Sequence, residues 1–177
     1  MSDAPQKKPY QSTMERHPEH VRAIGMISIE LANLEVHLAD LLGVMLNRSK
    51  AIAHSIYFTP RANIARIDII IAVANVIAEK HPKPARRVQN FGKRARNIMQ
   101  KRHDHIHNAW GVAEDTGKVG SGKLPMRDKN WKPVDDKELL NIVSDLRNLI
   151  TEIADSLDGI HDGIWDARGT ARQPDQK

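Results

Sequence analysis

The sequence predicts an all-α protein: a helical bundle of four to five helices, with an extended loop or a small β-hairpin before the last helix. Three observations support this fold class. Apolar residues recur every three or four positions over long segments, which is typical of amphipathic helices. Alternating runs of β-branched residues are missing. Aromatic residues are scarce, with three Trp, two Tyr and two Phe among 177 residues.

The first long helix is expected over residues 19–47. Its apolar positions step by three and four and form one continuous seam, made of Ile24, Ile27, Leu31, Leu34, Leu38, Leu41 and Met45. The polar residues before it, 1–18, include three prolines and are expected to form a flexible N-terminal arm.

Three further segments also predict helices. Ser49 is suited to cap a short helix that ends near Thr59. Residues 62–80 are rich in Ile and Val, and Ile67–Val73 alone would also suit a buried strand, but the total length and the interspersed Ala residues favour a buried helix. A basic helix is expected over residues 85–108.

The chain changes character over residues 111–134, where clustered glycines and turn-forming polar residues predict the loop or hairpin. The last helix is expected over residues 135–165, with an apolar stripe of Leu139, Ile142, Leu146, Leu149, Ile153, Leu157, Ile160 and Ile164. Residues 19–166 would then form a single domain, followed by a flexible tail over 167–177.

The composition excludes several classes of function. The chain has no Cys, so a disulfide, a thiolate nucleophile or a cysteine-ligated metal is ruled out. Neither a membrane-spanning run nor a signal peptide is recognisable, and a cytoplasmic protein without membrane contact is expected. Walker-type phosphate loops, dinucleotide fingerprints and HExxH metal motifs are also absent.

The net charge of +5 is unevenly distributed. Residues 1–110 carry 17 basic and 9 acidic side chains, whereas residues 111–177 carry 10 and 13. From Lys83 through Arg102 there is no acidic residue, and a basic helix face binds phosphates by neutralising their charge. The candidate RNA-binding residues are Arg86, Arg87, Lys93, Arg94, Arg96, Asn97, Lys101 and Asn108. The alternative is a solvated face whose cations pair with the acidic last helix.

Three histidines alternate with other residues at positions 103, 105 and 107. On a helix, His103 and His107 could converge on a metal ion while His105 points away; on a strand, all three would share a face. A further ligand is not evident, so no metal or other cofactor is predicted. Three surface histidines near a helix end are the simpler interpretation.

Arg102 and His107 suggest a metal-free chemistry instead. A guanidinium holds a phosphate through two hydrogen bonds, and an imidazole exchanges protons near neutral pH, with an ordinary pKa of about 6.5. Together they would let a ribose 2′-hydroxyl attack the neighbouring phosphate. Residues five apart on a regular helix differ in direction by about 140°, so the helix would have to end or kink near His107, or a second subunit complete the site. A competing candidate for the same chemistry consists of Arg96, Asn97 and His103.

The run Arg102-His103-Asp104-His105-Ile106-His107 near the end of a bundle helix resembles the motif of HEPN domains (higher eukaryotes and prokaryotes nucleotide-binding). That motif is an Arg, a polar residue and a His four to six residues beyond the Arg. Asn108 stands here where a Gly is frequent, and the long first helix with Leu34-Glu35 is also similar.

The resemblance implies a metal-independent endoribonuclease, such as a toxin or phage-defence effector, or a non-catalytic relative that binds RNA, a nucleotide or a partner protein. By position, Arg102 would bind the phosphate, His103 would be its polar companion and His107 the catalytic histidine. The resemblance also implies a homodimer and, in a toxin system, an antitoxin protein as partner.

Overall fold

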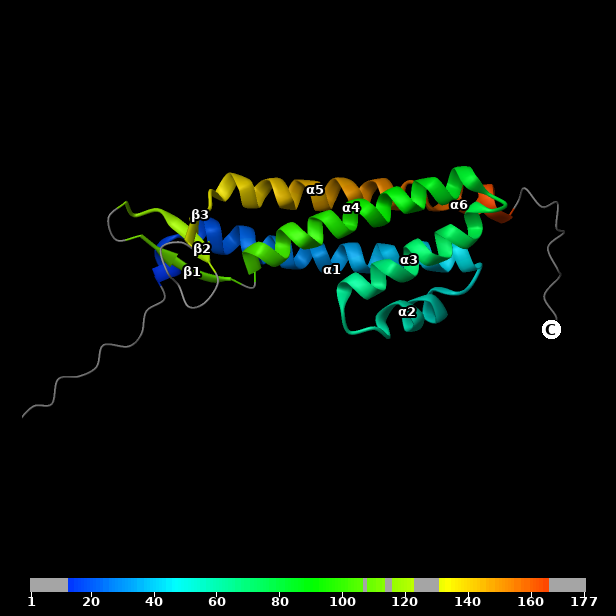
Figure 1. Ribbon diagram of the computed structural model, residues 1–177, viewed down its shortest axis with the longest axis horizontal. Helices are drawn as coiled ribbons and strands as arrows, with labels where there is room; N and C mark the ends of the chain where they lie inside the picture. The colour runs from blue at the N-terminus through cyan, green and yellow to red at the C-terminus, as the bar shows by residue number, and fades with distance from the viewer. Residues whose placement is uncertain (1–12, 107, 114–115, 123–130, 166–177) are drawn as a thin grey trace, which may run out of the picture.

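The computed structural model describes residues 13–106, 108–113, 116–122 and 131–165 (Figure 1). In chain order its elements are the 3₁₀ helix η1 (Thr13–Arg16), α1 (Pro18–Leu46), α2 (Lys50–Phe58), α3 (Asn63–Ala78), α4 (Pro82–Ile106), β1 (Ala109–Val112), β2 (Val119–Gly122), β3 (Trp131–Pro133), α5 (Asp136–Ala154) and α6 (Leu157–Trp165). The expected helical bundle is therefore present. Most of the expected arm and all of the expected tail lie outside the described residues.

Helix α1 runs through the bundle and packs against α5, while α2 packs against the C-terminal part of α1 (Figure 1). The fully buried Ile27, Leu34, Leu38 and Leu41 belong to the predicted seam. Burying each such side chain stabilises the fold by about 1.5–3 kcal/mol. Ser49 caps α2 as expected, since its side chain accepts a hydrogen bond from the Ile52 backbone N–H.

Helices α3 and α4 form an antiparallel hairpin, and α3 includes the whole segment for which a strand was the alternative. The two helices approach closely at Gly92, where a Cβ would lie 2.7 Å from Cγ1 of Ile71. Helix α4 begins at Pro82, three residues before the expected start, because a proline fits the first helical turn, where its missing N–H has no partner to lose.

The segment after α4 forms a three-stranded antiparallel sheet in the order β1-β2-β3, one strand more than the expected hairpin. Ala109 pairs with Gly122 and Val112 with Val119, and Gly117, with φ of +66°, lies in the turn between these two strands. The indole of Trp110 donates a hydrogen bond of 2.7 Å to the carbonyl of His105, which ties the sheet to the end of α4.

The predicted last helix is in fact two helices, so the described residues contain six α-helices and not four to five. The break lies at Asp155 and Ser156. The buried Ser156 hydroxyl donates to the carbonyl of Glu152, and such side-chain bonds to the preceding turn bend helices. Helix α6 continues beyond α5 along α1, where Trp165 donates a 3.0 Å hydrogen bond to the Val44 carbonyl.

No helix in the described ranges has both the length and the apolar character needed to cross a membrane.

Candidate nucleic-acid interface

Helix α4 carries nearly all of the residues that the sequence singles out. Its buried side is apolar, with Ala85, Val88, Phe91, Ala95 and Ile98 enclosed in the core. The cations occupy the remaining circumference, so different ones face α3, α5 and solvent. Their surroundings decide which of them remain available to a ligand.

A hollow of about 450 Å³ lies where the C-terminal part of α4 meets the start of α3. It is lined by Arg61, Ala62, Asn63, Ile64, Met99, Gln100, Arg102 and His103. Arg102 is partly buried and His103 is exposed. The hollow thus brings the predicted Arg102 and His103 together with Arg61 and Asn63, and none of the described residues that line it is acidic.

The start of α3 adds a further attraction for anions to this hollow. Its N-cap residue, Ala62, provides no side-chain hydrogen bond to the first-turn N–H groups. Such N–H groups carry partial positive charge at a helix N-terminus. With the guanidinium groups of Arg61 and Arg102 beside them, the hollow is suited to a phosphate group.

The alternating histidines have different surroundings. His103 lines the hollow, whereas His105 faces α5, with Nε2 3.4 Å from Oε1 of Glu138. His107, the predicted catalytic histidine, lies outside the described residues. In the described part of the chain, no three His, Asp or Glu side chains are grouped so that they could hold a metal ion.

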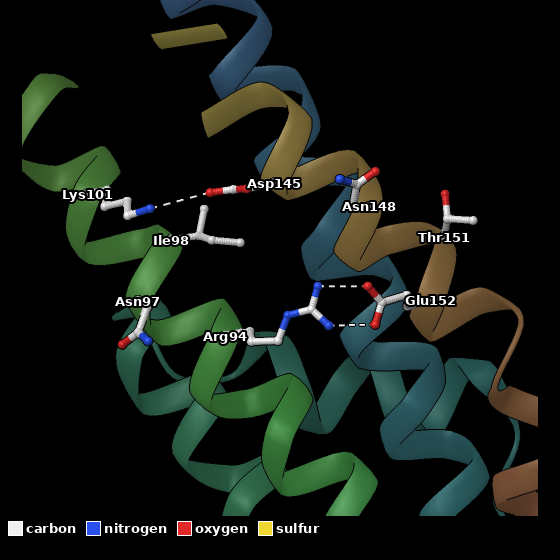
Figure 2. A pocket seen from close by; sticks show the side chains of 8 residues that line it. All are labelled: Arg94, Asn97, Ile98, Lys101, Asp145, Asn148, Thr151 and Glu152. Carbon is white, nitrogen blue, oxygen red and sulfur yellow. Dashed lines mark hydrogen bonds and ion pairs between the residues drawn. The ribbon is translucent and has the colours of Figure 1, made fainter. Parts of the chain in front are cut away.

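On the side of α4 that faces α5, cations pair with acids. Arg94 donates two hydrogen bonds to the Glu152 carboxylate, at 2.5 and 2.8 Å, and Lys101 lies 3.4 Å from Asp145 (Figure 2). This bond to Arg94 lowers the pKa of Glu152 and raises that of Arg94. These pairs cross an open groove of about 490 Å³ that Asn97 also lines. The two cations are therefore partly neutralised within the chain.

Arg96 is held on the other side of α4, where it pairs with Asp68 of α3. It does not line the hollow that contains His103. The structure thus groups His103 with Arg102 and not with Arg96, the competing partner. Asn108 follows the end of α4 and is not among the residues that line the hollow.

The remaining predicted cations gather near the start of α4. Arg86, Arg87 and Lys93 line a shallow hollow of about 660 Å³, together with Lys83, Gln89 and Asn90. The Arg87 guanidinium lies 5.9 Å from the centre of the Phe91 ring. This part of the helix keeps a concentration of exposed positive charge.

Sequence reasoning missed Arg61 and Asn63. They follow Pro60 and show no motif, but they lie about as far before the turn at His81 as Arg102 lies after it. In an antiparallel helix hairpin, such positions face each other. The symmetry of the hairpin was therefore the signal that could have found them.

Comparisons with protein-family models, with curated proteins and with solved structures find no match to this chain.

Proposed function

We propose that this protein is a metal-independent endoribonuclease of the HEPN type and that the hollow between α3 and α4 holds the scissile phosphate. The observation that carries the proposal is the grouping of Arg61, Arg102 and His103 beside the uncapped start of α3. Two guanidinium groups and a helix N-terminus are complementary to a phosphate whose negative charge grows in the transition state.

In the proposed reaction, His107 accepts the proton of a ribose 2′-hydroxyl, and the 2′-oxygen attacks the adjacent phosphorus. Arg102 and Arg61 stabilise the charge on the non-bridging oxygens. The bond from phosphorus to the 5′-oxygen breaks, and that oxygen takes a proton from an imidazolium. The products are a 2′,3′-cyclic phosphate and a free 5′-hydroxyl, and no metal ion takes part.

The test is cleavage of mixed cellular RNA by purified wild type, His107→Ala and Arg102→Gln, with EDTA present throughout. Wild type should cleave and leave cyclic phosphate ends. His107→Ala should lose at least about 100-fold in rate, since general acid–base catalysis contributes about 100-fold or more. Arg102→Gln should also lose about 100-fold or more, because it removes a donor to the charge that develops on the phosphate. Circular dichroism should show the same helix content and melting temperature for all three proteins.

Two results would contradict the proposal in different ways. Full-rate cleavage by His107→Ala would show that the chemistry lies elsewhere. RNA that is bound by wild type but never cleaved would instead support the non-catalytic RNA-binding module.

A further inference from the structure

The outer side of α4, away from the core, carries a straight row of five exposed residues: Arg86, Asn90, Lys93, Asn97 and Gln100. Their spacing of four, three, four and three residues places them one above another on a helix. We call this row the α4 ridge. It consists of two cations and three amides, all able to donate hydrogen bonds.

The ridge is flanked on both sides by side-chain pairs, three of which occupy an acid of a neighbouring helix. Towards α5, Arg94 binds Glu152 and Lys101 binds Asp145. Towards α3, Arg96 binds Asp68, and Gln89 donates a 2.8 Å hydrogen bond to Asn75. Figure 2 shows Asn97 pointing away from the Arg94–Glu152 pair. In the described ranges none of the five ridge side chains takes part in a hydrogen bond or an ion pair.

The ridge also leads to the hollow between α3 and α4. Its first three members line a different, shallow hollow, the one near the start of α4, which Lys83 and Arg87 also line. Its last member, Gln100, lines the hollow that contains Arg102 and His103. The row is therefore continuous from a cationic patch to the candidate reaction site.

We propose that the α4 ridge binds the backbone of one single-stranded RNA segment and directs it into the hollow. Neighbouring ridge residues are about 5–6 Å apart, which is close to the spacing of phosphates along an extended strand. The helix rises about 21 Å from Arg86 to Gln100, enough for several nucleotides. The row is one residue wide, which matches one phosphate backbone and not the two of a duplex. This inference names the substrate class of the proposed ribonuclease and rests on that function only for the step in the hollow.

The ridge inference assigns different roles to the basic residues of α4. Arg86 and Lys93 contact phosphates, and the amides of Asn90 and Asn97 add hydrogen bonds to sugar or phosphate oxygens. Arg94, Arg96 and Lys101 act by holding acids away from the strand. Removing a whole flanking pair should therefore cost little binding, whereas removing ridge cations should weaken it.

The experiment measures binding of a fluorescent, mixed-sequence 2′-O-methyl RNA strand of about 16 nucleotides, which is within the range bound by single-strand binding sites. This probe lacks the 2′-hydroxyl nucleophile and cannot be cleaved by the proposed reaction. The dissociation constant is measured over a series of salt concentrations for the full chain and its variants.

Arg86→Gln/Lys93→Gln should lower the slope of log affinity against log salt by about 1.4, because each phosphate contact contributes about 0.7 on a single strand. Between about 1 M and 0.1 M salt this change in slope corresponds to roughly 25-fold weaker binding. Asn90→Ala/Asn97→Ala should weaken binding without changing the slope, because amides neutralise no phosphate.

Two variants serve as matched controls. Arg22→Gln/Arg48→Gln removes the same charge from exposed sites on and just after α1. Arg94→Gln/Glu152→Gln removes a flanking pair with no change in net charge. Both should bind within about two-fold of wild type, and circular dichroism should show that every variant retains the wild-type fold.

The same strand annealed to its complement serves as a duplex probe and should bind more weakly than the single strand. An unchanged slope in Arg86→Gln/Lys93→Gln, an equal loss in Arg22→Gln/Arg48→Gln, tighter binding of the duplex, or no binding by wild type would each overturn the ridge inference. Failure of the proposed catalysis looks different. The ridge results would then hold with the uncleavable strand, while natural RNA stays intact in the presence of wild-type protein.

Discussion

The basic residues on the two sides of α4 have different surroundings. On the side that faces α5, Arg94 and Lys101 are bound to Glu152 and Asp145. At the start of α3, Arg102 shares a hollow with Arg61 and His103, and the described lining of that hollow has no carboxylate. The two sides carry similar cations in the sequence. The comparison indicates that the acids of the neighbouring helix, and not only the number of basic residues, determine how much positive charge one side of a basic helix presents.

Among the substitutions that test this difference between the two sides of α4, Arg61→Gln should have the largest effect on RNA cleavage. Removing this guanidinium should slow RNA cleavage by about 10- to 100-fold, because a hydrogen bond to a charged group contributes about 1.5–3 kcal/mol. The matched control is Arg22→Gln, which removes an exposed guanidinium of α1 that does not line the hollow. The measurement is the initial rate of cleavage of one RNA under EDTA. Equal losses in the two variants would mean that net charge, and not position in the hollow, determines the rate.

A second difference between the two sides of α4 is how closely the neighbouring helix approaches. Gly92→Ala would place a Cβ 2.7 Å from Cγ1 of Ile71, which lies along the α3 contact. Overpacking of this kind costs about 1–3 kcal/mol, and the better helix propensity of Ala recovers up to about 1 kcal/mol of it. We therefore expect a net loss in the free energy of unfolding, measured by urea denaturation.

Gly25→Ala is the control for Gly92→Ala, because it makes the same change on the exposed face of α1, where a Cβ would meet nothing within 4 Å. It should stabilise the protein by about 0.5–1 kcal/mol through helix propensity alone. If both substitutions shift the free energy of unfolding in the same direction, the close contact at Gly92 is not what requires glycine there.

Much of the bundle could be predicted from the sequence because the spacing of its apolar residues fixes which side of each helix is buried. The seam of α1 and the cap of α2 by Ser49 are examples. The break between α5 and α6 could not be predicted in the same way. The apolar stripe continues across it, and the break coincides with the bond of the Ser156 hydroxyl to the Glu152 carbonyl, which the apolar spacing does not reveal.

The candidate site could be predicted only in part. Arg102 and His103 lie on one helix and belong to one local motif, so sequence alone groups them. Arg61 joins them through the antiparallel packing of α3 on α4, which is a tertiary property. The pairing of Arg94 with Glu152 depends on the register between α4 and α5, which the apolar pattern does not fix to a single residue.

The smallest effect concerns the Arg94–Glu152 pair itself. Both side chains are substantially exposed, at 34% and 49% of their surface, so the pair should contribute less than about 1 kcal/mol to stability. The hydrogen bond from Arg94 lowers the pKa of Glu152 in the folded protein. The contribution of the pair to the free energy of unfolding is therefore fully present above the unfolded-state pKa of Glu152. It is lost as the pH falls through the lower folded-state pKa.

The free energy of unfolding of wild type and Arg94→Gln/Glu152→Gln should therefore differ slightly at about pH 7, and the difference should vanish in acid below the lowered folded-state pKa of Glu152, where the carboxylate is protonated. Urea denaturation at both pH values measures the difference. Added salt at neutral pH should also reduce it, since exposed ion pairs are screened. If the difference persisted in acid, the stabilisation would come from packing of the two side chains and not from their charges. Arg94 would then not be electrostatically neutralised on the α5 side, and the contrast between the two sides of α4 would rest on Lys101 alone.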